Sequence, residues 1–495
     1  MSAGQATAPP APPAGPAAEV AALRAALDRA GFTNDAVRAA LGAGMELQSQ
    51  SFEIAVQDRR LGGVPDELAA LVRLLVLDLP APAAAVERAL GDGAELLVRL
   101  GVAAERDGEL RAAARIVPHD ELLVASDRVA EDAPEHVAGV HWPSATLSHL
   151  TVRRQVGTAL DVGTGNGIQA LRLAAHAGRV VATDVNERAL AFAEFNAALN
   201  GVGNVELRAG SFFEPVAGER FDLVVCNPPY VISPETEHVF RDSGLPGDTV
   251  SEQLVRDLPS FLADDAFATI TISWIAGDDV AARPRAWLAG SGCDAWILHT
   301  APEDPLRSAA SWNRTLGGGP DEVGVKLDSW LEYYARLGID AIAYGAVVLH
   351  RRAGDNWVRS IELTTGLRNP ASAHLLRLFA AQELLAAARG DALLDRALVL
   401  VEDARLDRTE HLAGGAWLLT SADVRLAEGL GFGAKLDRYG VGVVTALDGS
   451  APLRPRLPAL AAELGVPEDD LAAFASQLVG QLVELGFAAE SSSAR

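Results

Sequence analysis

Cysteine is nearly absent from this chain of 495 residues, which contains only Cys226 and Cys293. Two cysteines cannot form the disulfide framework of a small secreted domain, so we expect a protein of the reducing cytoplasm. The chain also lacks an uninterrupted apolar run of about 18 residues, which excludes an obvious membrane span. Residues 1–18, MSAGQATAPPAPPAGPAA, have neither the basic start nor the leucine-rich stretch of a targeting signal, and they predict a disordered Pro/Ala tail.

Positively charged side chains are also few in this sequence. Lysine occurs only at Lys326 and Lys435, and the net charge is −24. Residues 119–354 contain 18 basic and 32 acidic side chains, a net charge of −14. A protein that follows a nucleic-acid backbone is expected to have a basic stripe. The composition therefore disfavours nucleic acid as the main partner, although a local patch such as Arg153–Arg154 stays open.

Three domains are expected after the tail. Residues 19–118 have apolar positions at helical spacing, followed by an alternating stretch with Asp107–Gly108 as a hairpin turn, and they predict a winged-helix-like N-terminal domain. Residues 355–495 predict a C-terminal α+β domain, also winged-helix-like. VRLGVAAER at 98–106 is similar to VELGFAAES at 483–491, which is compatible either with a duplicated module or with chance.

The pattern changes between these two domains, over residues 119–354. Short β-rich runs (GTALDVG, RVVATDV, NVELRAG, FDLVVCN and AFATITISW) alternate with helical segments such as GIQALRLAAHA. Strands that alternate with helices predict an α/β fold with a Rossmann-like, doubly wound parallel sheet. CDAWILH and DAIAYGAVVLHRR are expected to add strands at the end of that sheet.

A glycine-rich loop follows the first of these strands. Glycines let the backbone approach a ligand closely, and the helix that follows is expected to offer N–H groups to a carboxylate. An acidic side chain at the end of the next strand, Asp184, is suited to accept from the two ribose hydroxyls of a nucleoside. The dinucleotide fingerprint GxGxxG has a different spacing. The residues of the loop are Asp161, Gly163, Thr164, Gly165, Asn166 and Gly167.

The fourth strand ends in Asn227-Pro228-Pro229-Tyr230. The carboxyl ends of the strands line the ligand crevice of such a sheet, and the prolines restrict this turn to few conformations. The Asn227 side-chain oxygen and the Pro228 carbonyl can accept both hydrogens of an –NH2 group on a planar nitrogen, which disperses the positive charge that develops during attack on a methyl group. Tyr230 is expected to pack against the planar face of the substrate. All four residues are therefore candidate catalytic residues.

The GxGxG loop with its preceding acid resembles motif I of class I S-adenosylmethionine (SAM)-dependent methyltransferases. The NPPY quartet is similar to that of methyltransferases acting on planar nitrogens, including DNA amino-methylating enzymes, ribosomal RNA guanine methyltransferases and release factor glutamine methyltransferases. The layout also resembles actinobacterial methyltransferases in which helical regions flank a small methyltransferase domain. The resemblance adds Val185, Ser211, Phe212 and Asn227 to the SAM site, with Ser211 standing where this family usually has Asp.

This resemblance implies an enzyme that uses SAM to methylate a protein glutamine amide or a small-molecule amide or amine. The alternatives are a methyltransferase acting on nucleic-acid bases and a SAM-binding regulatory protein without activity. Arg241 and Asp242, in a loop like that of the release-factor type, either touch the substrate or pair with each other. The C-terminal extension beyond residue 354 has no counterpart in the release-factor enzymes, so the acceptor stays open.

Two further groups of residues allow a functional or a structural interpretation. No histidine lies at a metal-ligand spacing backed by cysteine or carboxylate, and no metal site is expected. The tryptophans of the middle domain either enclose a substrate or fill the core. The residues in question are His119, His136, His141 and His149, and Trp142, Trp274, Trp296, Trp312 and Trp330.

Overall fold

The β-rich runs in the middle of the chain pair into one eight-stranded sheet. Its strands are β6 (Val156–Val162), β7 (Ala177–Asp184), β8 (Val205–Ala209), β9 (Phe221–Cys226), β10 (Leu262–Ile275), β11 (Cys293–His299), β12 (Ile342–Arg351) and β13 (Val358–Glu362). Their order is β13-β11-β12-β10-β9-β6-β7-β8, and only β12 runs antiparallel to its neighbours. The prediction of a Rossmann-like α/β sheet is confirmed, including β11 and β12 at its end.

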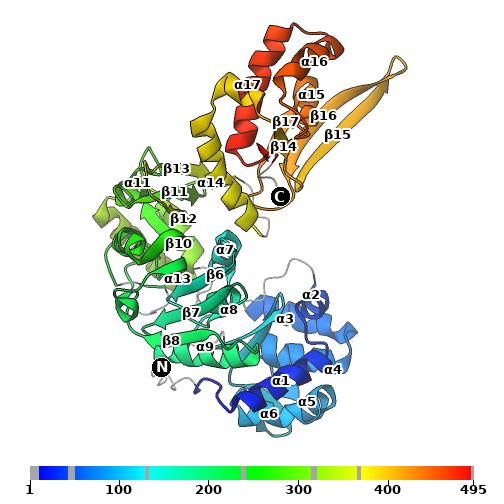
Figure 1. Ribbon diagram of the computed structural model, residues 1–495. Helices are drawn as coiled ribbons and strands as arrows, with labels where there is room; N and C mark the ends of the chain where they lie inside the picture. Colours follow the sequence, from blue (N-terminus) through cyan, green and yellow to red (C-terminus); the bar gives the residue numbers. More distant parts are fainter. Residues whose placement is uncertain are drawn as a thin grey trace. The chain divides into compact units, whose positions relative to one another are not determined.

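The computed structural model describes residues 10–42, 51–128, 133–235, 241–242, 244–313, 320–364 and 370–491. The chain forms two compact units (Figure 1): residues 1–148 with 154–362, and residues 149–153 with 363–495. The sheet extends beyond the predicted boundary at residue 354, because β13 pairs with β11. The half-buried residues of β13 gave no strong strand pattern.

The start of the predicted tail, residues 1–9, lies outside the described residues. Residues 10–16 have no regular structure, and the Ala14 N–H donates to the Leu100 carbonyl at 3.0 Å. Within the described residues, no helix is long and apolar enough to cross a membrane.

Helices connect and cover the strands of the sheet. In this part of the chain they are α7 (Trp142–Leu150), α8 (Ile168–Ala174), α9 (Glu187–Leu199), α10 (Thr249–Asp257), α11 (Ala282–Trp287), α12 (Pro305–Asn313) and α13 (Pro320–Leu337). The first two crossovers, α8 and α9, lie where the sequence predicts helices. Crossovers of this kind leave the carboxyl ends of the parallel strands together at one edge, where ligands bind in open α/β sheets.

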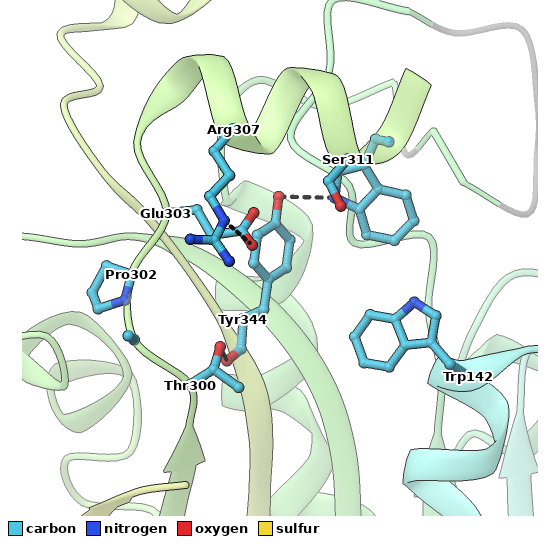
Figure 2. Close-up of a pocket in the computed structure, with 9 residues that line it drawn as sticks. Trp142, Thr300, Pro302, Glu303, Arg307, Ser311 and Tyr344 are labelled. Atoms are coloured by element: carbon cyan, nitrogen blue, oxygen red, sulfur yellow. Dashed lines mark hydrogen bonds and ion pairs between the residues drawn. The ribbon is translucent and has the colours of Figure 1, made fainter. Parts of the chain in front are cut away.

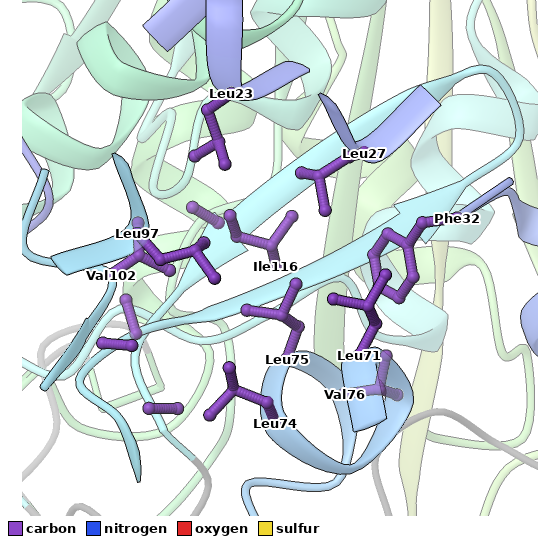
Figure 3. Packing of buried hydrophobic residues seen from close by; sticks show 14 of the residues in the cluster. Leu23, Leu27, Phe32, Leu71, Leu74, Leu75, Val76, Leu97, Val102 and Ile116 are labelled. Atoms are coloured by element: carbon purple, nitrogen blue, oxygen red, sulfur yellow. The ribbon is translucent and has the colours of Figure 1, made fainter. Parts of the chain in front are cut away.

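The N-terminal region packs against α9 around a core of its own. Its elements are α1 (Ala17–Arg29), α2 (Asn34–Leu41), α3 (Ser51–Arg60), α4 (Asp66–Leu71), β1 (Ala81–Pro82), α5 (Ala83–Leu90), α6 (Gly93–Arg99), β2 (Ala103–Arg106), β3 (Glu109–Ala112), β4 (Arg115–His119) and β5 (Leu122–Ser126). Leu23, Leu27, Phe32 and Ile116 meet in this core (Figure 3), which continues to Phe192 of α9. The predicted turn between β2 and β3 is confirmed, with positive φ at both of its residues.

The second unit contains a helical group and a long hairpin. Its elements are α14 (Ser372–Ala387), β14 (Leu398–Leu400), β15 (Ala404–Ala413), β16 (Ala416–Leu426), β17 (Gly433–Leu436), α15 (Arg438–Ala446), α16 (Leu457–Leu464), α17 (Glu468–Glu484) and β18 (Ala488–Glu490). Gly101 and Gly486, in the two similar segments, both follow a helix at φ 75° and 70°. In each case the next N–H, that of Val102 or Phe487, donates back into the last turn at 2.8 Å. The segments share this local geometry, while the winged-helix and duplication hypotheses stay predictions.

One buried asparagine joins the N-terminal region to the glycine loop. Asn196 of α9 is fully buried, accepts from the Ala125 N–H at 2.7 Å and donates to the Ala125 and Asn166 carbonyls at 2.9 and 2.8 Å. All of its polar atoms are therefore used to hold other parts of the chain. This makes Asn196 a structural link between β5 and the loop after β6.

We expect Asn196→Ala to lower the free energy of unfolding by about 3 kcal/mol, because it leaves buried backbone groups without partners. The change is measured by urea titration at fixed pH. The matched control, Asn356→Ala, removes an exposed asparagine and should cost about 0.5 kcal/mol. Equal effects of the two substitutions would contradict the assignment of Asn196 as a link.

Candidate functional site

The register of four neighbouring strands places three predicted site residues and one further residue in one row. Val162 of β6 lies opposite Thr183 of β7 on one side and Cys226 of β9 on the other. Cys226 in turn lies opposite Ile270 of β10. Each of these strands adds its next residue at the same edge of the sheet, and neighbouring strands are about 4.8 Å apart. The row consists of Asp184, Gly163, Asn227 and Thr271.

The glycines of the loop have two different roles. All three adopt positive φ, at 71° for Gly163, 54° for Gly165 and 84° for Gly167. A Cβ on Gly163 or Gly165 would meet no atom within 4 Å, so both face open space. A Cβ on Gly167 would come within 3.0 Å of Ala193 in α9, so this glycine allows close packing of the helices. The first two leave room for a ligand at the backbone.

Asp161 acts on the loop itself. It is buried, and its Oδ2 accepts from the Thr164 hydroxyl at 2.6 Å and from the Ala170 N–H at 3.0 Å. Burial, reinforced by the charge of Asp184, raises its pKa to about 7. Asn166 is also buried, and its Oδ1 accepts from the Ile168 N–H at 3.0 Å.

These bonds correct one expectation from the sequence. Two of the first three N–H groups of α8, those of Ile168 and Ala170, are already bonded to Asn166 and Asp161. They are therefore not available to a ligand carboxylate. A sequence cannot distinguish an acid that contacts a ligand from one that satisfies its own helix.

The next strand end provides the carboxylate and apolar surface expected beside a nucleoside. Asp184 accepts from the Gly165 N–H at 2.8 Å and from the Asn186 N–H at 2.9 Å, and burial raises its pKa. Val185 is 59% exposed directly after a buried strand. Phe212 is half-buried with φ 44°, and its carbonyl accepts from the Thr183 hydroxyl at 3.0 Å. The neighbouring Ser211 is also half-buried.

The turn after β9 is held by side chains from β10. The Thr271 hydroxyl donates to Asn227 Oδ1 at 2.6 Å, and the Ser273 hydroxyl donates to the Tyr230 carbonyl. Pro228 is buried and Pro229 half-buried. Both ends of the quartet are thus fixed to the neighbouring strand.

Tyr230 is more enclosed than the sequence suggests. Its side chain is 6% exposed and meets the Trp312 ring edge-on, with 6.2 Å between centroids. Burial raises its pKa, which keeps the phenol neutral. Its ring packs against that of Trp312, and the expected contact with the planar face of a substrate stays a prediction.

Sequence reasoning did not identify Thr271 and Ser273 as part of the site. A signal was present in AFATITISW, where hydroxyl residues at alternate positions share one face of an apolar strand. Side chains at alternate positions of a strand point to the same side, so two successive hydroxyls can reach the same turn.

A pocket of about 360 Å³ lies at the same edge of the sheet (Figure 2). Trp142 of α7, Trp312 of α12 and Tyr344 of β12 provide its aromatic walls, and Glu303 and Arg307 also line it. The tryptophans are therefore divided between a pocket and the core, and enclosure of a substrate stays a prediction. Trp142 and Trp312 line the pocket, whereas three others are buried in the core: Trp274, Trp296 and Trp330.

The two residues left open in the loop after the quartet pair with each other. Arg241 Nε donates to Asp242 Oδ1 at 2.9 Å, and Arg241 also bonds to Glu235. Ser233 donates to the same Asp242 oxygen at 2.9 Å. This favours the structural role for both residues. Within the described ranges, no group of three or more His, Cys, Asp or Glu side chains is arranged to hold a metal.

Comparison with known proteins identifies two segments. Residues 144–242 match the family model described as Methyltransferase small domain, and residues 29–113 match one described as Domain of unknown function (DUF7059). The release factor glutamine methyltransferase of Aliivibrio fischeri is 42% identical over 88 residues, which are 17% of this chain and 30% of the relative. The ribosomal protein uL3 glutamine methyltransferase of Bradyrhizobium diazoefficiens is 26% identical over 204 residues, 35% of this chain and 63% of the relative. The family match supports a methyltransferase domain within the predicted residues 119–354, and the bounds of that domain stay a prediction.

These similarities cover limited parts of the proteins. The chain spans 30% of the length of the first curated relatives that it matches. Among solved structures, the ribosomal protein L11 methylase of Lactobacillus delbrueckii subsp. bulgaricus has 19% identity and a TM-score of 0.25, over 43% of this chain and 77% of that chain. A methyltransferase from Pyrococcus furiosus has 16% identity and a TM-score of 0.28, over 44% of this chain and 87% of that chain.

We expect the raised pKa of Asp161 to make folding less favourable as pH rises. In the unfolded chain this carboxyl ionises near its ordinary pKa of 3.8, whereas in the folded protein it does so at about 7. The stability contributed by the neutral carboxyl is therefore complete below about pH 4 and is lost as pH rises to about 7. The wild type should lose up to about 1.4 kcal/mol per pH unit relative to Asp161→Asn in this window. Urea titrations at several pH values measure this difference, and a constant difference would contradict it.

Proposed function

We propose that this chain, a class I SAM-dependent methyltransferase, transfers the methyl group of SAM to the side-chain amide nitrogen of a protein glutamine. The observation that supports this best is the row at the edge of the sheet, where Asn227 and Gly163 follow paired residues of adjacent strands. A cofactor held by the glycine loop and an amide held by Asn227 would then be neighbours.

The residues present fit SAM. Gly163 and Gly165 leave open space beside the backbone. The Asp184 carboxylate accepts the Gly165 and Asn186 N–H groups on different oxygens, and its four lone pairs leave capacity to accept from a ribose hydroxyl. Val185 and Phe212 provide apolar surface for the adenine ring. When bound, SAM supplies an electrophilic methyl group on a sulfonium.

Asn227 and Pro228 would orient the acceptor amide. The lone pair of an amide nitrogen is delocalised, so the nitrogen is a poor nucleophile. Two oxygens that accept its hydrogens turn the lone pair toward the methyl group and stabilise the positive charge that develops. In such a transfer the new N–C bond would replace the S–C bond of SAM, S-adenosylhomocysteine would leave, and the nitrogen would lose one proton to solvent.

Thr271 holds Asn227 in place. Its hydroxyl occupies one lone pair of Asn227 Oδ1, which leaves the other available to the substrate. An acceptor oxygen that is fixed before the substrate arrives needs no reorganisation during the reaction. We therefore assign Thr271 as a positioning residue.

Two features favour a protein as the acceptor. The relatives named above are described as glutamine methyltransferases of a release factor and of a ribosomal protein. Residues 119–354 have a net charge of −14, which suits a basic protein better than an RNA backbone.

We expect Asn227→Ala to reduce methyl transfer by about 100- to 1000-fold while leaving the affinity for S-adenosylhomocysteine within about twofold. Transfer is measured as the initial rate at which methyl-labelled SAM labels the proteins of a lysate from the same source. Calorimetry gives the affinity. Undiminished labelling by the variant would contradict the role assigned to Asn227. A loss of affinity for S-adenosylhomocysteine as large as the loss of methyl transfer would also contradict it.

Thr271→Val tests the positioning role separately. It keeps the shape of the side chain but removes the bond to Asn227, and we expect a drop of about tenfold in kcat with little change in the KM for SAM. Thr158→Val is the matched control, because its hydroxyl bonds to Asp222 at the opposite end of β6. If both variants lose activity equally, Thr271 has no special relation to catalysis.

A further inference from the structure

The aromatic pocket lies beside the proposed acceptor position. Trp312, one of its walls, contacts Tyr230 edge-on. Tyr344, another wall, lies opposite Ser273, whose hydroxyl holds the Tyr230 carbonyl. A group in the pocket would therefore be separated from the Asn227–Tyr230 turn by little more than one aromatic ring.

Hydrogen bonds hold two of the aromatic walls of the pocket in place. The Tyr344 hydroxyl is satisfied by Ser308 at 2.6 Å and by the Trp312 indole N–H at 2.8 Å. These bonds fix both rings. The third ring, Trp142, is 60% exposed at the start of α7, and it points into the same space as Tyr344 (Figure 2). A large exposed aromatic side chain at a concave site is a common anchor for a partner.

A carboxylate completes the pocket. The backbone of Glu303 is fixed by two bonds to Ile342, at 2.8 and 2.9 Å, and its side chain is 22% exposed. Two indoles, a phenol and a carboxylate together are suited to a cation, which the ring faces attract and the carboxylate pairs. A guanidinium fits best, because it is planar, stacks on aromatic rings and can bond to a carboxylate through two N–H groups.

Arg307 does not fill this role itself. Its side chain is 74% exposed, and its contact to Glu303 is an ion pair of 3.5 Å. Such an exposed pair contributes little stability, so a better-placed guanidinium can replace it. The carboxylates of Glu303 and Asp304 also leave this segment with a net negative charge, although it contains Arg307.

We infer that the pocket binds an arginine side chain of the acceptor protein, close in sequence to the methylated glutamine. This inference rests on the proposed function, and it defines the substrate class as a basic protein segment. The acidic charge of residues 119–354 is complementary to such a segment. Binding in the pocket would hold the acceptor chain while the Asn227 turn orients the amide.

The test uses short alanine–glycine peptides with a central glutamine and one arginine, placed at each other position in turn. Each peptide has a twin with citrulline, which keeps the planar shape but has no charge. Binding to the full-length protein is measured by calorimetry, and methylation is measured in parallel. For the best placement we expect arginine to bind about tenfold more tightly than citrulline.

Three variants test whether the preference for arginine over citrulline arises in the pocket. Glu303→Gln should remove the preference for arginine, whereas Glu252→Gln, at a surface ion pair with Arg256, should retain it. Arg307→Ala should strengthen arginine binding, because it leaves Glu303 without a competing cation. Thermal unfolding shows that each variant is folded.

The outcomes separate the two proposals. Equal binding of arginine and citrulline peptides, or a preference that survives Glu303→Gln, overturns the arginine pocket, and the proposed function stands if the glutamine is methylated. An arginine preference that depends on Glu303, without methylation of any peptide, supports the pocket and counts against the proposed function.

Discussion

The register of the central sheet is the constraint on which the site depends. Because Val162, Thr183, Cys226 and Ile270 lie side by side, the next residues of their strands meet at one edge. A slip of one residue would turn every side chain of a strand to the other face of the sheet. Burial of these strands on both faces, with helices packed against them, keeps the register and therefore the distance between the glycine loop at Gly163 and the turn at Asn227.

Hydrogen bonds from neighbouring side chains fix the loops at this edge of the sheet. Asp161 and Asn166 satisfy the first turn of α8, and Thr271 and Ser273 hold the turn after β9. These bonds lie within the protein and fix its shape before a ligand arrives. The groups left open are those that a methyltransferase needs: two glycines facing space, a carboxylate with spare lone pairs, and an amide oxygen.

Local backbone demands explain what the sequence predicted well. Glycines required at positive φ and prolines that stiffen a strand end are visible in the residue types themselves, so the loop at Gly163 and the turn at Asn227 could be found. Contacts between residues that lie far apart in sequence could not be found in this way. Trp142 and Trp312 line one pocket only because the fold brings α7 and α12 to it, and β13 has a weak sequence pattern. The bonds that occupy the N–H groups of Ile168 and Ala170 depend on side-chain directions that no spacing reveals.

The most direct test of the proposed activity is to incubate the pure protein with SAM labelled in its methyl group and a lysate of its own source. The products are divided by protease, ribonuclease and size, and the peptides are sequenced by mass spectrometry. The proposed activity predicts label on glutamine side chains of protein, released by protease. Label released by ribonuclease, label confined to small metabolites, or no label at all would contradict it.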